Sequence, residues 1–151
     1  MGVKEIESSN LGIGLKNIKN GNFANIKVSN CNYTGINIQN CYNLVVRDYV
    51  SIDNLYSPNG TSYGISINDS KDITIDRMHT EVQRHACAIG GFQLSANIRI
   101  TNSILKSKIN YAADCHAGYG IFYENCTIIG GAVLGPPFIV LSNCVITNYN
   151  T

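Results

Sequence analysis

Charged residues are scarce in this chain, and their scarcity limits what the protein can bind. Lys, Arg, Asp and Glu make up 14% of the 151 residues, and the formal net charge is +1. A surface with so little charge is largely neutral and polar, and it gives no electrostatic reason to expect DNA, RNA or an anionic membrane as a partner. A neutral sugar surface fits at least as well. We therefore expect neither nucleic-acid binding nor membrane insertion.

Targeting segments, helices and linkers are also missing. The N-terminus lacks the basic and apolar regions of a signal peptide, and no apolar run approaches the roughly 18 residues that a membrane helix needs. The best helix candidate, residues 78–89, has no clean apolar stripe, and we interpret it as a loop excursion. No Ser/Gly-rich run, charge block or low-complexity segment divides the chain. We therefore expect one domain over residues 1–151.

The six cysteines form no familiar motif. No pair has the Cys-x-x-Cys spacing, which excludes a zinc ribbon or a thioredoxin-type site. Four cysteines follow an asparagine, at Asn30-Cys31, Asn40-Cys41, Asn125-Cys126 and Asn143-Cys144. A recurring dipeptide indicates a recurring structural position, in which cysteine acts as a small buried hydrophobe. We predict that these four thiols are unpaired, as in a protein assembled in a reducing compartment.

Asparagine and isoleucine are abundant instead, with 20 and 21 residues, and they recur in a pattern. Each unit begins with glycine or proline, continues as an alternating apolar strand, turns at Asn or Asp, and ends in a second alternating strand. The units begin at Gly12, Gly35, Gly64, Gly91, Gly120 and Pro137. The strands keep their length while the linkers between them vary, which is typical of a parallel β-solenoid.

This pattern predicts an all-β fold, a single-stranded right-handed parallel β-helix of about six rungs with variable loop excursions. Asparagines at equivalent corners are expected to stack, each amide bonding to the one a rung away. An antiparallel β-sandwich is the alternative, but a sandwich does not require the same Gly and Asn at corresponding positions. Because an uncapped rung exposes strand edges and apolar core, we expect a longer native protein or self-association.

Two segments that end alike, with small residues, glycine and an apolar residue, stand out: RHACAIGGF, residues 84–92, with Arg84 and His85, and ADCHAGYGIF, residues 113–122, with Asp114 and His116. Superposing Gly91 on Gly120 makes the two segments neighbours on successive rungs, about 4.8 Å apart. This superposition places His85 opposite Asp114, and Cys87 opposite His116. We therefore predict that His85, Asp114 and His116 face one patch, with Arg84 and Glu81, in the adjacent excursion, close by.

These features resemble a known group of proteins. Gly-strand-Asn-strand rungs with Asn-Cys corners are similar to the pectate-lyase-like right-handed β-helix. Within it, RHACAIGG followed a rung later by ADCHAG resembles bacteriophage tailspikes and tail-appendage proteins that cleave bacterial surface polysaccharides. The resemblance implies a virion tail protein that assembles in the host cytoplasm and is a homotrimer at full length. Tailspikes are several times longer than this chain, which looks like the central part of one.

The resemblance implies a polysaccharide depolymerase, and glycoside hydrolysis is the first expectation for its chemistry. Hydrolysis needs two carboxyl groups that flank the scissile bond. Asp114 is the first candidate and Glu81 the second, while His85 or His116 acts as acid or base or sets the protonation state of a carboxyl group.

Three further residues are candidates for holding the substrate. Arg84 is suited to anchor a sugar acid group through a bidentate contact. Tyr111 and Tyr119 offer flat surfaces on which a sugar ring packs. The partner expected from these assignments is a bacterial surface polysaccharide.

Two other functions stay open, and a third is set aside. A polysaccharide lyase needs a base such as His and a group that neutralises a uronate carboxylate. A rigid glycan-binding or structural shaft needs neither. A metal site formed by His85, Cys87, Cys115 and His116 matches no zinc spacing, and strand alternation sends the last two to opposite faces. We therefore expect no metal and no cofactor.

Overall fold

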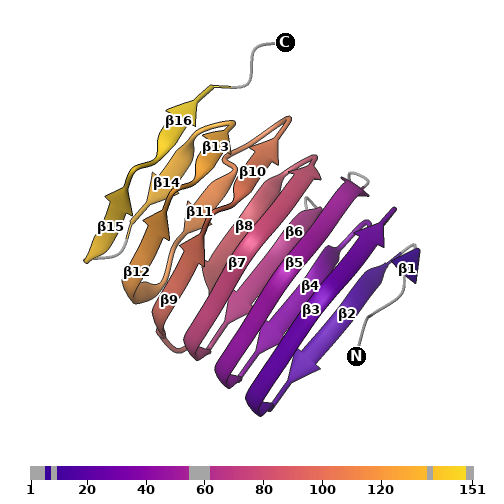
Figure 1. The fold of residues 1–151 in the computed structure, drawn as a ribbon, viewed down its shortest axis with the longest axis vertical. Helices are drawn as coiled ribbons and strands as arrows, with labels where there is room; N and C mark the ends of the chain where they lie inside the picture. The colour runs from indigo at the N-terminus through magenta and orange to yellow at the C-terminus, as the bar shows by residue number, and fades with distance from the viewer. Residues whose placement is uncertain (1–5, 8–9, 55–61, 136–137, 149–151) are drawn as a thin grey trace.

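The computed structural model describes residues 6–7, 10–54, 62–135 and 138–148. Every regular element among these residues is a β-strand, and the strands wind into a stack of successive rungs (Figure 1). Adjacent strands pair in parallel throughout the described part of the chain. The predicted right-handed parallel β-helix is confirmed. The described residues include no helix that could span a membrane.

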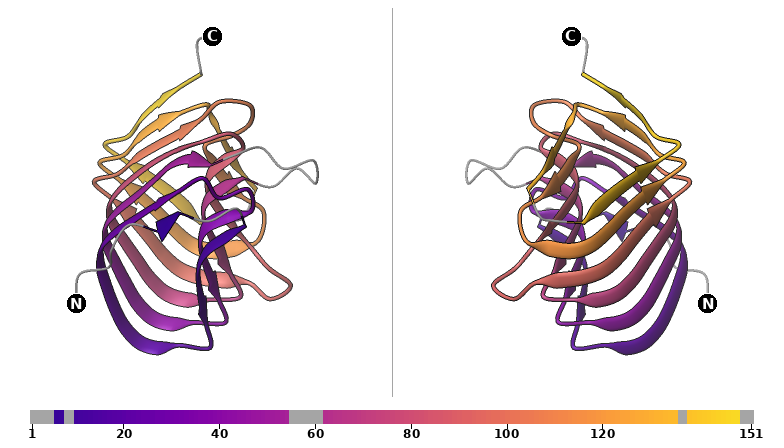
Figure 2. Two further views of the ribbon diagram at one scale, coloured as in Figure 1. Left: turned by 90° about the vertical axis from the view of Figure 1, so that its right-hand side faces the viewer. Right: turned by 90° about the vertical axis from the view of Figure 1, so that its left-hand side faces the viewer.

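Two parallel sheets enclose the core between them (Figure 2). The smaller sheet has six strands, one for each rung: β2 (Leu11–Lys16), β4 (Thr34–Gln39), β6 (Tyr63–Asn68), β8 (His85–Gly90), β11 (Ala113–Cys115) and β14 (Ala132–Leu134). The larger sheet has ten: β1 (Ile6–Glu7), β3 (Lys19–Ser29), β5 (Tyr42–Asn54), β7 (Lys71–Val82), β9 (Ser95–Thr101), β10 (Ile104–Ser107), β12 (Gly118–Glu124), β13 (Thr127–Ile129), β15 (Ile139–Ser142) and β16 (Val145–Thr147).

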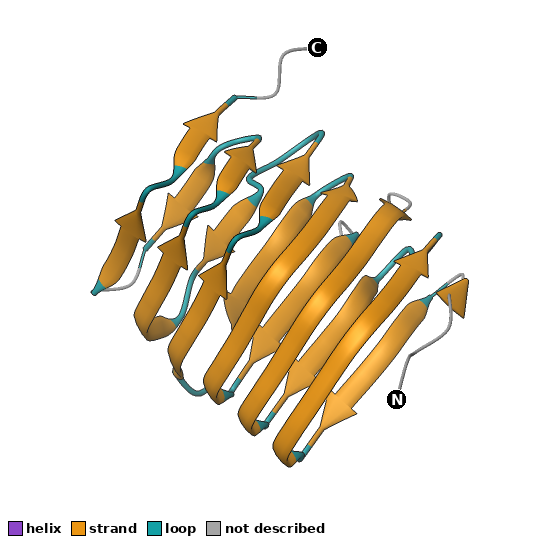
Figure 3. Cartoon of the chain, in the orientation of Figure 1, coloured by secondary structure: helices purple, strands orange, loops and turns teal. Residues whose placement is uncertain are grey.

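Residues with a left-handed backbone mark turns of the chain, and they recur in three columns along the stack. Some lie in the short connections between strands (Figure 3), whereas others, such as Asn25, Asp48 and Arg77, bend the long strands β3, β5 and β7. The corner residues of successive rungs have positive φ: Asn17, Asn40, Asp69 and Gly91 in the first column, Asn20, Asn43, Asp72, Asn97, Gly120 and Phe138 in the second, and Asn25, Asp48, Arg77, Asn102, Asn125 and Asn143 in the third. Asparagine and glycine adopt this left-handed conformation more readily than other residues. The abundance of asparagine follows from this requirement.

The corner amides also bond from rung to rung, as predicted. Asn40 Nδ2 donates to Asn17 Oδ1 at 2.7 Å, and Asn43 Nδ2 donates to Asn20 Oδ1 at 2.8 Å. At the other end of the stack, Asn143 Nδ2 donates to Asn125 Oδ1 at 2.8 Å. These ladders run parallel to the helix axis, so they link rungs that the backbone hydrogen bonds of each sheet already join.

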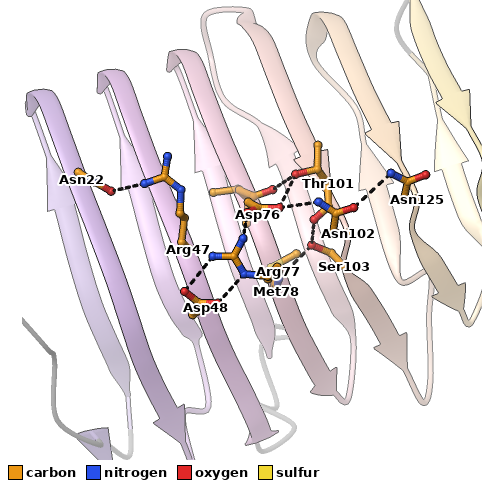
Figure 4. A network of polar contacts seen from close by, with 11 residues as sticks. Asn22, Arg47, Asp48, Asp76, Arg77, Met78, Thr101, Asn102, Ser103 and Asn125 are labelled. Carbon is orange, nitrogen blue, oxygen red and sulfur yellow. Dashed lines mark hydrogen bonds and ion pairs between the residues drawn. The ribbon is translucent and has the colours of Figure 1, made fainter.

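Two rungs of the third column replace this ladder with ion pairs (Figure 4). Arg77 occupies a left-handed corner, and its Nε and Nη2 lie 2.7 and 3.0 Å from the two carboxylate oxygens of Asp48. This guanidinium holds the pKa of Asp48 below its ordinary value. Asn102 donates to the Asp76 carboxylate at 2.8 Å, and the amide ladder resumes where Asn125 Nδ2 donates to Asn102 Oδ1 at 3.2 Å. The bidentate contact of Arg77 with Asp48 thus joins two rungs at a position where other rungs are joined by an amide hydrogen bond between asparagines.

The four Asn-Cys pairs share a local geometry, although they lie at different corners. In each pair a left-handed or turning residue precedes a cysteine whose thiol donates to the carbonyl oxygen two residues earlier, at 3.3 to 3.6 Å. Ser70 and Ser103 make the same bond with their hydroxyls. None of the six cysteines is joined in a disulfide in this structure, which agrees with the prediction for the four Asn-Cys cysteines. Cys144 differs in being partly exposed.

The register predicted from glycine is wrong beyond the third unit. Gly12, Gly35 and Gly64 lie side by side in the smaller sheet, but the next positions of this column are Ala86 and Ala112. Gly35 lacks a Cβ because that atom would overlap the Tyr49 hydroxyl, which donates to the Gly64 carbonyl. By contrast, Gly91 and Gly120 are corner residues with φ of +116° and +64°. Glycine therefore has two roles here. In the first three units it avoids a steric clash inside the smaller sheet, whereas Gly91 and Gly120 form left-handed corners at other positions of the rung.

The interpretation of residues 78–89 as a loop excursion is also wrong. Most of this segment belongs to β7 and β8, and only Gln83 and Arg84 separate the two strands. Met78, Thr80 and Val82 point inward and are buried, while the intervening side chains face outward. Because one inward position holds a threonine, the apolar alternation is interrupted in the sequence although the strand is continuous.

Replacing Gly35 with alanine is expected to destabilise the protein by about 2 kcal/mol, because the new methyl group displaces the buried Tyr49 hydroxyl from its hydrogen bond. Gly14 is the matched control, since a Cβ there would lie 3.4 Å from Leu11, an ordinary contact. Urea unfolding of both variants measures the effect. Equal stability of Gly35→Ala and Gly14→Ala would contradict this packing.

Candidate functional site

The predicted cluster of His85, Asp114 and His116 forms on the outer face of the smaller sheet. Asp114 lies in the middle of β11, between two inward-facing residues that belong to the core. His85 begins β8, on the preceding rung, and His116 directly follows β11. Asp114 pairs with Ala88, and Cys87 pairs with Ala113, so the side chains meet diagonally rather than in the directly opposed register that we predicted.

His85 is buried and held by the backbone of the next rung. Its Nδ1 lies 2.8 Å from the carbonyl oxygen of Tyr111. Because a carbonyl oxygen only accepts, Nδ1 carries a proton and donates it. The other ring nitrogen, Nε2, lies 3.3 Å from Asp114 Oδ2. The imidazole is therefore oriented by the fold with Nε2 toward the carboxyl group.

Asp114 is a buried carboxyl group between two imidazoles. Asp114 is only 4% exposed, although it lies on the outer face of the sheet. His116 Nε2 approaches Asp114 Oδ1 to 2.8 Å, and the His116 side chain is 71% exposed. The His116 ring is not aligned for a hydrogen bond to Oδ1, which accepts none among the described residues. The carboxyl group thus has one oxygen near a buried histidine and one near a solvent-accessible histidine.

Burial sets the electrostatic state of His85. Removal from water lowers the pKa of the imidazole below its ordinary value, more strongly than the Tyr111 carbonyl and the Asp114 carboxyl group raise it. Arg84 and His116 lower the pKa further. At neutral pH His85 is consequently the neutral tautomer with its proton on Nδ1.

A row of aromatic rings borders the cluster. The Tyr63 ring centroid is 5.3 Å from that of His85 and 6.4 Å from that of Tyr33, so three rings follow one another across successive rungs. The Arg84 guanidinium lies 5.8 Å from the centre of the Tyr63 ring. Tyr33 and Tyr63 are not among the site residues predicted from the sequence. The sequence does mark them, because each lies just before a glycine of the smaller sheet: Tyr33 is two residues before Gly35, and Tyr63 is one residue before Gly64.

Two of the predicted site residues lie elsewhere. Glu81 is not in a loop but on the outer face of the larger sheet, where its Oε1 is 3.1 Å from Lys106 Nζ and 3.8 Å from Lys108 Nζ. Tyr119 follows the corner after His116 and packs on Phe138, with 5.1 Å between ring centroids. Tyr111 is at the site, where its backbone carbonyl orients His85.

No group of three or more His, Cys, Asp or Glu residues within the described ranges could hold a metal ion. Cys115 is buried and faces the core, whereas His116 is exposed, in agreement with the predicted alternation. Burial raises the pKa of the Cys115 thiol to about 11, so it stays protonated at neutral pH. The chemistry available at the cluster is therefore proton transfer between a carboxyl group and two imidazoles.

The sequence matches the model of the Gp49 pectin lyase-like family over residues 29–151. The chain belongs to this family. The match includes every residue of the cluster and all but the first rung of the smaller sheet. No curated protein is detectably similar in sequence.

Three solved structures that are similar to this Gp49-family chain are phage tailspikes. The tailspike gp49 of Pseudomonas phage LKA1 superposes with a TM-score of 0.74 at 24% identity, over 93% of this chain and 26% of that one. The tailspike gp61 of Pseudomonas phage phi297 gives 0.66 at 24% identity, over 82% and 23%. The Gp54 tailspike of Acinetobacter baumannii phage AP22, solved with a capsular saccharide, gives 0.63 at 22% identity, over 85% and 22%. The resemblance to tailspikes is thus confirmed for the fold, and the chain spans about a quarter of their length.

The lowered pKa of His85 predicts that acid destabilises the protein. The unfolded chain takes up a proton at this histidine as the pH falls through its ordinary pKa, while the folded protein does not, so stability falls between about pH 7 and about pH 5. His85→Gln should reduce this loss, and the exposed His79→Gln should not. Urea midpoints at both pH values provide the test, and an unchanged loss in His85→Gln would contradict the assignment.

Proposed function

We propose that the outer face of the smaller sheet binds a bacterial surface polysaccharide and cleaves it by proton transfer at the Asp114 cluster, defined as His85, Asp114 and His116. The observation that carries the proposal is the buried Asp114 carboxyl group between a buried and an exposed imidazole. Burial of an ionisable group on the outer face of a sheet is unfavourable without a compensating role, and such groups gather at functional sites.

The Asp114–His85 pair supplies the proton donor. His85 already donates Nδ1–H to the Tyr111 carbonyl, so a hydrogen bond between Nε2 and Asp114 Oδ2 requires one further proton on either partner. A pair that shares a proton in this way can release it to a glycosidic oxygen as that oxygen leaves. His116, whose ring is exposed beside the same carboxyl group, is the group positioned to accept a proton from the substrate.

The arrangement favours elimination over hydrolysis between two carboxyl groups. Among the described residues, the charged groups that act on His85 are Asp114, Arg84 and His116, whereas Glu81 pairs with Lys106 on the larger sheet. Hydrolysis of the usual kind needs a second carboxyl group near Asp114. In elimination from a uronate, His116 takes the proton from the carbon next to the carboxylate, and the Asp114–His85 pair protonates the leaving oxygen. A carbon–carbon double bond forms as the glycosidic bond breaks.

The substrate class follows from the surroundings of the cluster. Arg84 beside Tyr63 provides a guanidinium for a sugar carboxylate, and the rings of Tyr33 and Tyr63 offer flat apolar surfaces for sugar rings. The AP22 tailspike, solved with an Acinetobacter baumannii capsular saccharide, supports a capsule or similar surface polymer. We further propose that the chain is part of a phage tail protein, which assembles in the host cytoplasm as a homotrimer at full length.

Asp114→Asn and His85→Gln are each expected to lower the rate of depolymerisation by about 10²- to 10⁴-fold, because each removes a partner of the shared proton. Glu81→Gln is the matched control and should retain activity, since its carboxylate engages Lys106. The assay follows chain length, new reducing ends and the ultraviolet absorbance of unsaturated uronates on a panel of capsular polysaccharides.

The products separate the chemical alternatives. Absorbance that rises with new reducing ends supports elimination, whereas reducing ends without absorbance would show hydrolysis. Full activity in folded Asp114→Asn would remove the cluster from the mechanism. Binding without cleavage by the wild type on every polymer would contradict the catalytic proposal and leave a glycan-binding shaft.

A further inference from the structure

One corner of the stack contains an insertion that the fold does not need. At the first corner column, Asp69 is followed directly by the inward-facing Ser70. One rung later, residues 92–94 separate Gly91 from Ser95, whose hydroxyl makes the equivalent bond to the Gly90 carbonyl. The next rung lacks the extra residues, because Gly118 pairs with Ser95 two residues after His116. The loop between β8 and β9 consequently projects beyond the neighbouring corners (Figure 2).

The insertion exposes large apolar side chains without packing them. Phe92 is 107% exposed and Leu94 is 68% exposed, and neither belongs to the hydrophobic core. Insertions in solenoids commonly lie on the binding face. An aromatic side chain held in water by a three-residue insertion therefore points to a ligand that covers it.

A pocket of about 210 Å³ lies beside Phe92 on the outer face of the smaller sheet. Its lining consists of Tyr33, Asn37, Gln39, Asn68, Asp69, Gly91 and Phe92. Neighbouring side chains fix part of this lining, because Asn37 Oδ1 accepts from Ser66 Oγ at 2.9 Å and from Asn68 Nδ2 at 3.3 Å. The side-chain nitrogen of Asn37, Nδ2, and the side chain of Gln39 make no hydrogen bond within the described residues. Both groups can therefore bond to a ligand.

The pocket and the Asp114 cluster both lie on the outer face of the smaller sheet, and one row of paired residues leads from one to the other. Asn37, Ser66, Ala88 and Asp114 are successive partners in the smaller sheet. Three rungs separate Asn37 from Asp114, which corresponds to roughly 14 Å at the usual spacing between parallel strands. The residues between them, Ser66, Ala88 and Gly90, are small. An extended chain can therefore lie across them from the cluster to the pocket.

We propose that the pocket beside Phe92 is a distal subsite for an uncharged sugar of the polysaccharide that the Asp114 cluster acts on. The inference rests on the proposed polysaccharide substrate. Amides and aromatic rings are the groups that recognise hydroxyls and the faces of sugar rings. The lining has no Lys or Arg, and Asp69 disfavours an acidic sugar. An acidic unit is thus bound near Arg84, and uncharged units extend toward the N-terminal rungs.

Amide NMR titrations with the methyl glycosides of glucose, galactose, N-acetylglucosamine and glucuronic acid test the subsite. At least one uncharged glycoside should shift the signals of Asn68 and Gly91, and methyl glucuronide should not. Phe92→Ala is expected to weaken this binding about tenfold. Leu94→Ala, which removes an exposed apolar side chain from the same insertion, and Asp114→Asn should bind as the wild type does.

The outcomes separate this inference from the proposed function. Unshifted Asn68 and Gly91 signals with every uncharged glycoside, or wild-type affinity in Phe92→Ala, would overturn the subsite even if the wild type cleaves polysaccharide. Preferred binding of methyl glucuronide would overturn its selectivity for uncharged sugars. Binding that depends on Phe92 in a chain that cleaves no polymer would support the subsite and refute the cleavage.

Discussion

Left-handed residues at the corners hold this structure in register. A parallel β-helix places each side chain one rung above its counterpart only if every rung turns at the same points, and three columns of positive φ produce those turns here. Each left-handed residue other than glycine has an unfavourable backbone conformation. Amide ladders, and the ion pair between Arg77 and Asp48, stabilise these conformations from rung to rung. The diagonal meeting of His85 with Asp114 follows from that register.

The two sheets use their outer faces differently. On the larger sheet, charged side chains neutralise one another across rungs, as Arg99 does with Glu124 and Lys106 with Glu81. On the smaller sheet, the ion-pair partners of the buried Asp114 within the described part of the chain are two histidines, which are weak partners when neutral. Side chains that are already paired have little left to offer a ligand. The smaller sheet, with its titratable groups and with amides that form no ion pairs, is therefore the face suited to recognition and proton transfer.

The strand pattern and the asparagine corners were predictable because both are local. Alternation and a left-handed turn depend on a few consecutive residues, and the Asn-Cys pairs mark such turns. The register was not predictable beyond the third unit, because Gly64 avoids a steric clash while Gly91 forms a corner, and the sequence shows both only as glycine. The adjacency of His85 and Asp114 was predicted even so, since an error of three residues along a strand still leaves neighbouring rungs in contact.

The remaining errors also have physical causes. Glu81 was assigned to a loop because the buried Thr80 interrupts the apolar alternation of β7. The insertion at residues 92–94 was hidden for the opposite reason, since Phe92 and Leu94 alternate with polar residues as a strand would. Tertiary packing decides both cases. A short window of sequence does not contain that information.

The central claim is that a polysaccharide crosses the rungs of the smaller sheet and places its scissile bond at Asp114. A crystal structure of Asp114→Asn with an acidic oligosaccharide from a capsule that the wild type cleaves tests it most directly. The account predicts a glycosidic oxygen within hydrogen-bond distance of residue 114 and a sugar ring on the row formed by Tyr33 and Tyr63. An oligosaccharide on the outer face of the larger sheet, with the smaller sheet empty, would contradict it.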